Sequence, residues 1–191
     1  STLALVNSGS IATNTARPVL RAEFRPTAYA NARLHAYGMH LMATDATGRA
    51  LQTSAARADS NARGTANLIY AGDFNIDSSS ETSYTNLTGS GNGQAFDPIN
   101  RPGTWTNNSS FADIHTQSTR LTQFGGGASG GMDDRFDFQV VSGELMDGEG
   151  LSYIGPTAPG TRPAHSYRTF GNGGNTFNNS VNAAANTSKP R

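Results

Sequence analysis

The sequence contains no cysteine, and this absence removes several kinds of chemistry at once. Without thiols there is no disulfide framework, no thiolate zinc site and no cysteine nucleophile. Charge is also scarce, because charged residues make up 15% of the 191 residues and the 14 basic residues balance the 14 acidic ones. A neutral chain has no global field that would draw it to nucleic acid or an anionic membrane, although a local phosphate site stays compatible with this composition.

Long apolar runs are missing as well. No segment approaches the roughly 20 residues that cross a bilayer, so we expect no membrane span. The first residues also lack the basic and apolar pattern of a signal peptide. Gly, Asn, Ser and Thr are abundant instead, which favours a domain rich in strands and tight turns. The length predicts a single domain over residues 1–191, and the composition of residues 182–191 predicts a flexible tail.

Local patterns predict a mixed order of strands and one helix. Strands are expected over Thr2–Val6, Val19–Phe24, Arg33–Met42, Asn67–Phe74 and Arg135–Ser142, with a turn at Asn7–Ser10. A helix is expected over Arg49–Arg63, with Leu51, Ala55, Ala58 and Ala62 as its buried stripe. Between residues 78 and 131 we expect mostly loop, anchored by Trp105 and Phe111.

The most informative motif is Gly72-Asp73-Phe74-Asn75, which follows the apolar run from Asn67 directly. Such a run indicates a strand buried on both faces, and polar residues at its end lie at the rim of the sheet, where α/β proteins build sites. Asp73 can orient a water or hold a hard cation, while Asn75 can donate to or accept from a phosphate oxygen. A polar turn that merely closes the strand is the competing interpretation.

Companion motifs in a fixed order favour a site over a turn. His40-Leu41 ends the preceding strand, a helical stretch follows it, and Asp133-Asp134-Arg135-Phe136-Asp137-Phe138 comes later. This order resembles the endonuclease/exonuclease/phosphatase superfamily, and most closely a bacterial, often secreted branch. Phe111-Ala112-Asp113-Ile114-His115-Thr116-Gln117-Ser118, Gly130-Gly131-Met132-Asp133 and Phe170-Gly171-Asn172-Gly173-Gly174 look like that branch. The resemblance implies an α/β fold of the deoxyribonuclease-I-like type, a layered β-sandwich with outer helices.

The resemblance also implies a chemistry, the metal-assisted hydrolysis of phosphate esters or nucleic acid. By resemblance, Asp73 would orient the attacking water or bind a cation, Mg²⁺ or else Mn²⁺ or Ca²⁺. His40 and Asn75 would contact the phosphoryl oxygens. Asp137 would support a catalytic His of the family's Ser-Asp-His motif and so fix its tautomer.

Several parts of the family pattern have no counterpart in this sequence. The family's first strand, its metal-binding Glu and its closing Ser-Asp-His motif are not found, and Met42 stands where many relatives have Lys. We therefore expect an incomplete domain, lacking the N-terminal part and the last strand, with negligible catalysis on its own. A missing domain half or a homo-oligomer would be its partner. The alternative is a non-catalytic extracellular structural or assembly protein on the same scaffold, and either version suits an extracellular setting.

Weaker signals favour structural roles. Asp73-x-Asn75-x-Asp77 imitates the start of an EF-hand loop, but Ser78 replaces the required Gly and Tyr84 the closing Glu. The run Gly125–Gly130 matches a dinucleotide fingerprint by letters alone, without the strand and helix that such a site requires, and predicts a surface loop. For His35, His115 and His165 a hydrogen-bonded structural role outweighs a ligand role, because none has a partner at metal-ligand spacing.

Overall fold

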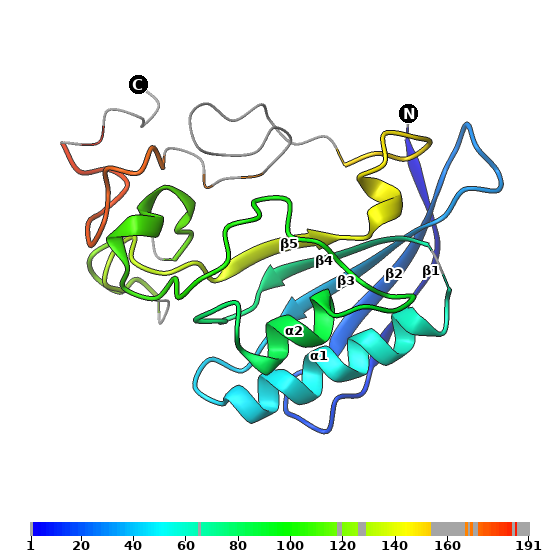
Figure 1. The fold of residues 1–191 in the computed structure, drawn as a ribbon, viewed down its shortest axis with the longest axis horizontal. Helices are drawn as coiled ribbons and strands as arrows, with labels where there is room; N and C mark the ends of the chain where they lie inside the picture. Colours follow the sequence, from blue (N-terminus) through cyan, green and yellow to red (C-terminus); the bar gives the residue numbers. More distant parts are fainter. Residues whose placement is uncertain are drawn as a thin grey trace. The chain divides into compact units, whose positions relative to one another are not determined.

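The computed structural model describes residues 2–64, 66–117, 120–125, 129–153, 167, 169, 172–184 and 186 (Figure 1). The chain forms two compact units. The first unit comprises Ser1–Asn75, Glu81–Arg101 and Phe138–Tyr167, and the second comprises Ile76–Ser80, Pro102–Asp137 and Arg168–Arg191. The flexible tail predicted over residues 182–191 lies largely outside the described residues. Phe170 and Gly171, which begin the predicted motif Phe170–Gly174, also lie outside them.

A five-stranded mixed sheet is the main element of the fold. Its strands are β1 (Leu3–Ile11), β2 (Val19–Pro26), β3 (Leu34–His40), β4 (Asn67–Asp73) and β5 (Asp137–Val141), in the spatial order β1-β2-β3-β4-β5. The first three strands pair antiparallel, and β3 pairs parallel with β4. A parallel pair needs a crossover connection, and helix α1 (Ala46–Asn61) supplies it.

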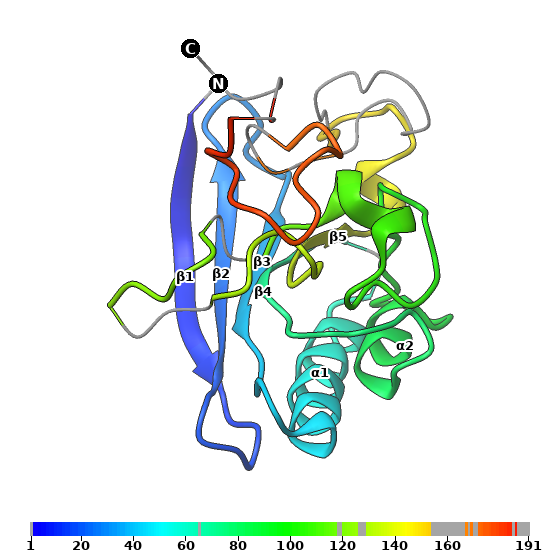
Figure 2. The same ribbon diagram turned by 90° about the vertical axis from the view of Figure 1, so that its left-hand side faces the viewer.

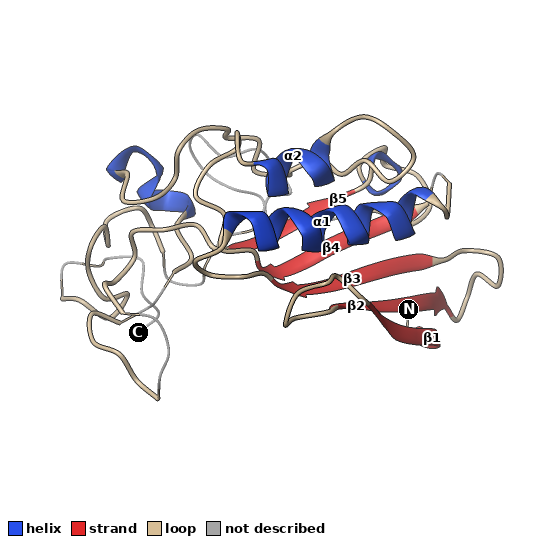
Figure 3. Ribbon diagram, turned by 90° about the horizontal axis from the view of Figure 1, so that it is seen from below, coloured by secondary structure: helices blue, strands red, loops and turns tan. Residues whose placement is uncertain are grey.

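Helices cover one face of this sheet. Helix α1 packs beside the shorter α2 (Thr82–Thr88), and both lie on the same side of the strands (Figures 2 and 3). Tyr37 of β3 marks this side, because its hydroxyl donates to Asp59 of α1 at 2.8 Å. Beneath the helices lies an apolar core that includes Tyr37, Met39, Leu68, Tyr70 and Phe74. A short 3₁₀ helix, Gly143–Leu145, follows β5.

The opposite face of the sheet carries exposed apolar side chains. Leu5 lies opposite Phe24 in the register of β1 and β2, and Leu20 lies opposite Gly38 in that of β2 and β3. Leu5 is 60% exposed and Leu20 is 61% exposed. Of the two sheets expected in a layered sandwich, the described residues therefore form one.

The second unit is built mainly from turns. Its regular elements among the described residues are the 3₁₀ helix Ser109–Ile114 and the isolated bridges Ser78↔Thr104 and Met132↔Phe177. Trp105 is fully buried, as expected of an anchor, and the Arg135 guanidinium lies 5.1 Å from the centre of its ring.

The expected strands and the expected helix are confirmed in kind, several boundaries are corrected, and one expected turn and part of an expected loop are wrong. The turn expected at Asn7–Ser10 is wrong, because those residues continue β1 opposite β2 after a shift of register between Leu5 and Asn7. Pairing with β2 satisfies their backbone groups, and this outweighs the turn preference of Asn, Ser and Gly. Helix α2 lies inside the expected loop, since Thr, Ser and Asn give little helix signal.

Helix α1 begins earlier than expected and buries a different face. Its N-cap is Asp45, whose side chain accepts a hydrogen bond from the Gly48 N–H at 2.9 Å. The expected stripe is wrong: Leu51 is 46% exposed, and the residues turned inward are Gly48, Arg49, Gln52, Thr53, Ala56 and Ser60. Two of these polar side chains, Arg49 and Gln52, are satisfied by backbone groups of other segments, which makes their burial possible.

Candidate functional site

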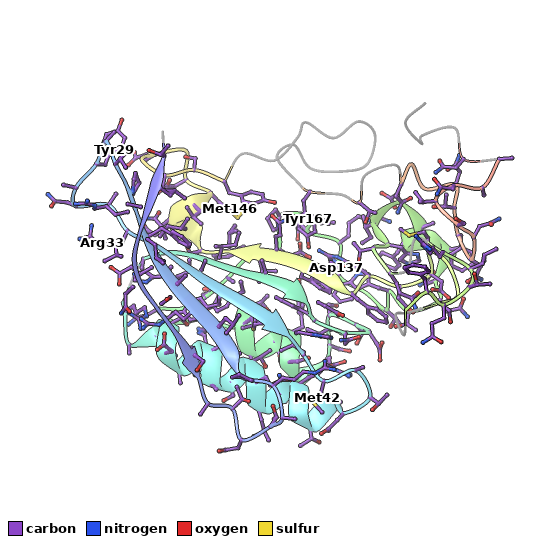
Figure 4. All side chains as sticks on the ribbon, turned by 180° about the vertical axis from the view of Figure 1, so that it is seen from behind. Tyr29, Arg33, Met42, Asp137, Met146 and Tyr167 are labelled. Carbon is purple, nitrogen blue, oxygen red and sulfur yellow. The ribbon has the colours of Figure 1, made fainter. Side chains whose placement is uncertain are left out.

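The candidate site lies where β3 and β4 end. Because the two strands are parallel, their carboxyl ends meet at one edge of the sheet, and the register sets His40 directly opposite Asp73. Met42 follows β3 at this end, whereas Tyr29 and Arg33 lie at the other end of the sheet (Figure 4). The sequence order His-Leu, helix, Gly-Asp-Phe-Asn therefore brings its polar residues together through strand pairing.

His40 and Asp73 form a partly exposed pair. Nε2 of His40 lies 3.5 Å from Oδ2 of Asp73, with side-chain exposures of 59% and 39%. Both side chains are on the sheet face turned away from the helices, since the inward residues of β3 are His35, Tyr37 and Met39. The pair can thus be reached by a solute while it stays fixed to the sheet.

Each residue of the Gly-Asp-Phe-Asn turn has a separate structural reason. Gly72 has φ 139°, and a Cβ at this position would collide with the carbonyl oxygen of Met39. Phe74 is fully buried and stacks on Phe138 with ring centres 5.2 Å apart. Asn75 has φ 49°, the left-handed region that Asn tolerates better than most residues, and its N–H donates to Oδ1 of Asp73 at 3.1 Å.

The main-chain N–H and carbonyl of Leu41 join this turn to the end of β3. The Leu41 N–H donates to the Asp73 carbonyl at 2.9 Å, and the Leu41 carbonyl accepts from Nδ2 of Asn75 at 3.1 Å. Asn75 is 8% exposed, and its side chain also interacts with the Asp73 carboxyl, which helps to oppose the rise of the Asp73 pKa. An amide nitrogen has two hydrogens, and the bond to Leu41 uses one of them.

The environment of Asp73 makes its ionisation less favourable than that of a free aspartate. Burial raises the pKa of Asp73, and the charge of His40, the hydrogen bond from the Asn75 N–H and the charge of Arg17 oppose that rise. A partly buried carboxyl with a raised pKa is common in functional sites. Its neighbours offset only part of the free-energy cost of burying the charge.

Arg17 is a neighbour of the site that the sequence did not reveal. It lies in the loop between β1 and β2, and its Nη1 donates to the Leu41 carbonyl at 2.8 Å. Gln52 and Arg49 of α1 were also missed as site residues, although both contact the backbone that follows β3. Their spacing of three residues puts them on one helix face, and this was the available signal.

Asp137 belongs to the second unit, so its position relative to the other three predicted residues is not described. It is the first residue of β5, is exposed, and its N–H donates to Oγ1 of Thr116 at 2.8 Å. The structure therefore gathers His40, Asp73 and Asn75, while a role for Asp137 stays a prediction.

A metal site is not complete within the described part of the chain. No group of three or more His, Asp or Glu side chains there could hold an ion. Asp73 offers a carboxylate, the ligand type that Mg²⁺ prefers, but the described residues do not by themselves make a full donor set. In the same part of the chain, no helix is long and apolar enough to cross a membrane.

The weaker motifs have structural explanations or fall outside the described residues. Asp77 of the EF-hand-like triplet accepts a hydrogen bond from Thr106 in the second unit. His115 is fully buried, with Nδ1 facing the Met132 carbonyl and Nε2 facing that of Trp105. His35 is buried under the helices, and burial, with the Arg63 charge next, lowers its pKa. Residues 126–128 of the Gly-rich run and His165 are not described.

Comparison with known proteins gives matches among solved structures. No protein-family model matches the sequence, and no curated protein matches it significantly. The human Nocturnin catalytic domain with bound sulfate is 15% identical, with a TM-score of 0.51 over 73% of this chain and 48% of its own. Truncated TDP2 of Caenorhabditis elegans is 16% identical, with a TM-score of 0.50 over 73% of this chain and 53% of its own.

A functionally unknown conserved protein from Enterococcus faecalis also matches, at 15% identity and a TM-score of 0.51 over 74% of this chain and 55% of its own. The chain thus spans about half the length of each of these structures. At such low identity, the matches establish the fold alone. The chain has an α/β fold of the deoxyribonuclease-I-like type, as its sequence motifs predict.

Proposed function

We propose that this chain provides the phosphate-ester-binding edge of a metal-dependent phosphoesterase or nuclease. The observation that supports the proposal is the convergence of His40, Asp73 and Asn75 at the carboxyl ends of two parallel strands, on a scaffold shared with phosphoesterase- and nuclease-type enzymes. His40 and Asn75 offer hydrogen-bond donors to phosphoryl oxygens, and Asp73 offers a carboxylate to a cation or a water. Binding without measurable hydrolysis is the activity proposed for the chain alone, because its described residues lack a full metal donor set.

Charge makes the proposal testable. A phosphate next to an ionised Asp73 is repelled unless a cation lies between them. In the wild type, affinity for inorganic phosphate should therefore rise when Mg²⁺ is added. Asp73→Asn removes the repulsion and the cation ligand together, so it should bind phosphate more tightly without Mg²⁺ and lose the response to Mg²⁺.

The measurement is a phosphate titration followed by NMR of the ring signals of His40, with and without Mg²⁺. His35 is the internal control, because it is buried on the other side of the same strand and should not respond. Equal Mg²⁺ responses in wild type and Asp73→Asn would contradict the role of Asp73, and an unresponsive His40 would contradict the site. Cleavage of bis-p-nitrophenyl phosphate by the wild-type chain with Mg²⁺ would contradict the proposed lack of catalysis.

A second candidate function is non-catalytic self-assembly in an extracellular setting, and strand β1 favours it. This strand is the edge of the sheet, it contains no charged residue from Leu3 to Ile11, and Leu3, Leu5 and Val6 are 50%, 60% and 49% exposed. Edge strands in monomers usually carry charges that prevent pairing with another chain. Sedimentation velocity should then show dimers that Leu5→Lys dissociates; a wild type that stays monomeric across concentrations would remove this candidate.

A further inference from the structure

A single buried side chain of helix α1 connects the segments that carry the candidate site. Gln52 is fully buried, and all of its hydrogen bonds go to backbone groups of other segments. Its Oε1 accepts from the Met42 N–H at 2.9 Å, and its Nε2 donates to the Arg17 carbonyl at 2.9 Å and lies 3.5 Å from the His40 carbonyl. Of the two orientations of the amide, only this one sets its oxygen against an N–H and its nitrogen against carbonyls.

These contacts lead to the site residues by short routes. The carbonyl of Arg17 is bound by Gln52, and the side chain of Arg17 donates to the Leu41 carbonyl at 2.8 Å. That same carbonyl accepts from Nδ2 of Asn75 at 3.1 Å. On the other side, the bond to Met42 fixes the backbone two residues after His40.

Packing alone does not account for a glutamine at this position. A buried amide among close-packed residues costs free energy unless its donors and acceptor are bonded, and an apolar residue would fill the space without that requirement. The neighbouring Arg49 already holds the chain just after Met42, through the carbonyls of Met42 and Ala43 at 3.0 Å each. What Gln52 adds is a link between the β1–β2 loop and the end of β3.

We propose that Gln52 is a positioning residue that sets the phosphate-binding geometry of His40 and Asn75 by tying the Arg17 loop to the end of β3. This inference rests on the proposed phosphate site and names what holds it in shape. Gln52 does not contact the phosphate itself, because it lies beneath the sheet edge and its bonds are all to backbone groups.

Gln52→Glu distinguishes the bond that Gln52 accepts from the Met42 N–H from the bond that it donates to the Arg17 carbonyl. The new carboxylate can still accept from the Met42 N–H, but it has no hydrogen for the Arg17 carbonyl. At pH 7 the affinity of the folded protein for inorganic phosphate should fall roughly tenfold, the effect of one buried unsatisfied group. As the pH is lowered from 7 to 5, the buried carboxyl takes up a proton and can donate again, so the ratio of variant to wild-type affinity should return toward one.

Gln94→Glu is the matched control. Gln94 is a partly buried residue of the same unit whose Nε2 also donates to a backbone carbonyl, that of Thr88 at 3.0 Å. Its variant should bind phosphate like the wild type at every pH. Urea denaturation of each variant gives the folded fraction, so that affinity is compared per folded molecule.

The outcomes distinguish positioning from mere support. A lower unfolding free energy of Gln52→Glu with unchanged phosphate affinity, or a loss of affinity that low pH does not reverse, would overturn the inference. If the wild type binds no phosphate, the proposed function fails, and Gln52 is then tested in the free protein. There, Gln52→Glu should move the NMR signals of the Asn75 side-chain amide and the His40 ring reversibly with pH, and unmoved signals would reject positioning.

Discussion

The two compact units of this chain differ in how much regular secondary structure surrounds their buried side chains. The core of the first unit is apolar and lies between a sheet and two helices, with Leu68, Tyr70 and Phe74 fully buried. The second unit buries polar side chains that bond to loop backbones: Asn172 donates through Nδ2 to the carbonyls of Ala112 and His115, at 2.9 Å each. Regular strands pair their own backbone groups, whereas irregular turns need side chains to do so.

The largest expected effect tests whether the two cores are separate. Trp105→Ala removes the largest fully buried side chain of the second unit and should lower the free energy of unfolding by about 3–5 kcal/mol. In hydrogen exchange, protection should fall over residues 102–117 and remain in β3 and β4. Phe74→Ala, which removes a fully buried ring of the first unit, should show the reverse, and an equal loss of protection in both units would contradict separate cores.

The next effect concerns the buried ion pair of the first unit. Nε and Nη2 of Arg49 bond both carboxylate oxygens of Glu81, at 2.6 and 2.9 Å, with side-chain exposures of 5% and 14%. Arg49→Met leaves that carboxylate buried without its partner and should cost about 3–5 kcal/mol in urea denaturation. The more exposed pair of Arg63 and Asp59 is the control, and Arg63→Met should cost about 1 kcal/mol or less.

A double variant checks the reason for that loss. Adding Glu81→Gln to Arg49→Met removes the uncompensated charge, so part of the stability should return. No recovery would mean that the bonds from Arg49 to the Met42 and Ala43 carbonyls carry the effect.

The smallest expected effect is a change of the free energy of unfolding with pH, which follows from a raised carboxyl pKa in each unit. Because burial raises the pKa of Asp73, the folded chain binds this proton more tightly than the unfolded chain does. The free energy of unfolding should therefore decrease as the pH rises from the ordinary aspartate value through the raised one. Asp73→Asn should remove this decrease and therefore make the chain more stable than the wild type at pH 7, with little difference below pH 3.

Asp134 is the counterpart in the second unit. Burial first, and the charge of Asp133 next, raise its pKa, so Asp134→Asn should change stability with pH in the same direction. Urea denaturation from pH 3 to pH 8 measures both variants. An Asp73→Asn curve with the slope of the wild type would contradict the raised pKa of Asp73.

The sequence predicted more of the first unit than of the second, because the first unit contains more regular secondary structure. Alternation and apolar runs predict β3, β4 and β5 because a paired strand with one or two buried faces leaves a period in the sequence. Pairing partners leave no such period, so the extension of β1 through Asn7 was missed. The buried face of α1 was missed because it carries polar residues, of which Arg49 and Gln52 bond backbone groups of other segments.

The sequence predicted which residues form the candidate site, but it did not predict the hydrogen bonds that position them. The order of His40, Asp73 and Asn75 was readable because strand ends place polar residues at a sheet edge. Arg17 and Gln52 act on backbone carbonyls, and a carbonyl is the same at every position of the sequence. The second unit contains further bonds of this kind, such as those from Asn172 to the carbonyls of Ala112 and His115, and they left no signal in the sequence.

The main-chain hydrogen bonds of Leu41 have a consequence for experiments that map this site by mutagenesis. Its carbonyl accepts from Arg17 and Asn75, and its N–H donates to Asp73, so the atoms that join these segments belong to the main chain. Alanine scanning leaves those atoms in place and would report Leu41 only as an apolar residue. Replacing the His40–Leu41 amide by an ester through chemical synthesis would remove the Leu41 N–H, and replacing the Leu41–Met42 amide by an ester would weaken the Leu41 carbonyl as an acceptor. The two replacements would expose a dependence that no encoded side chain reveals.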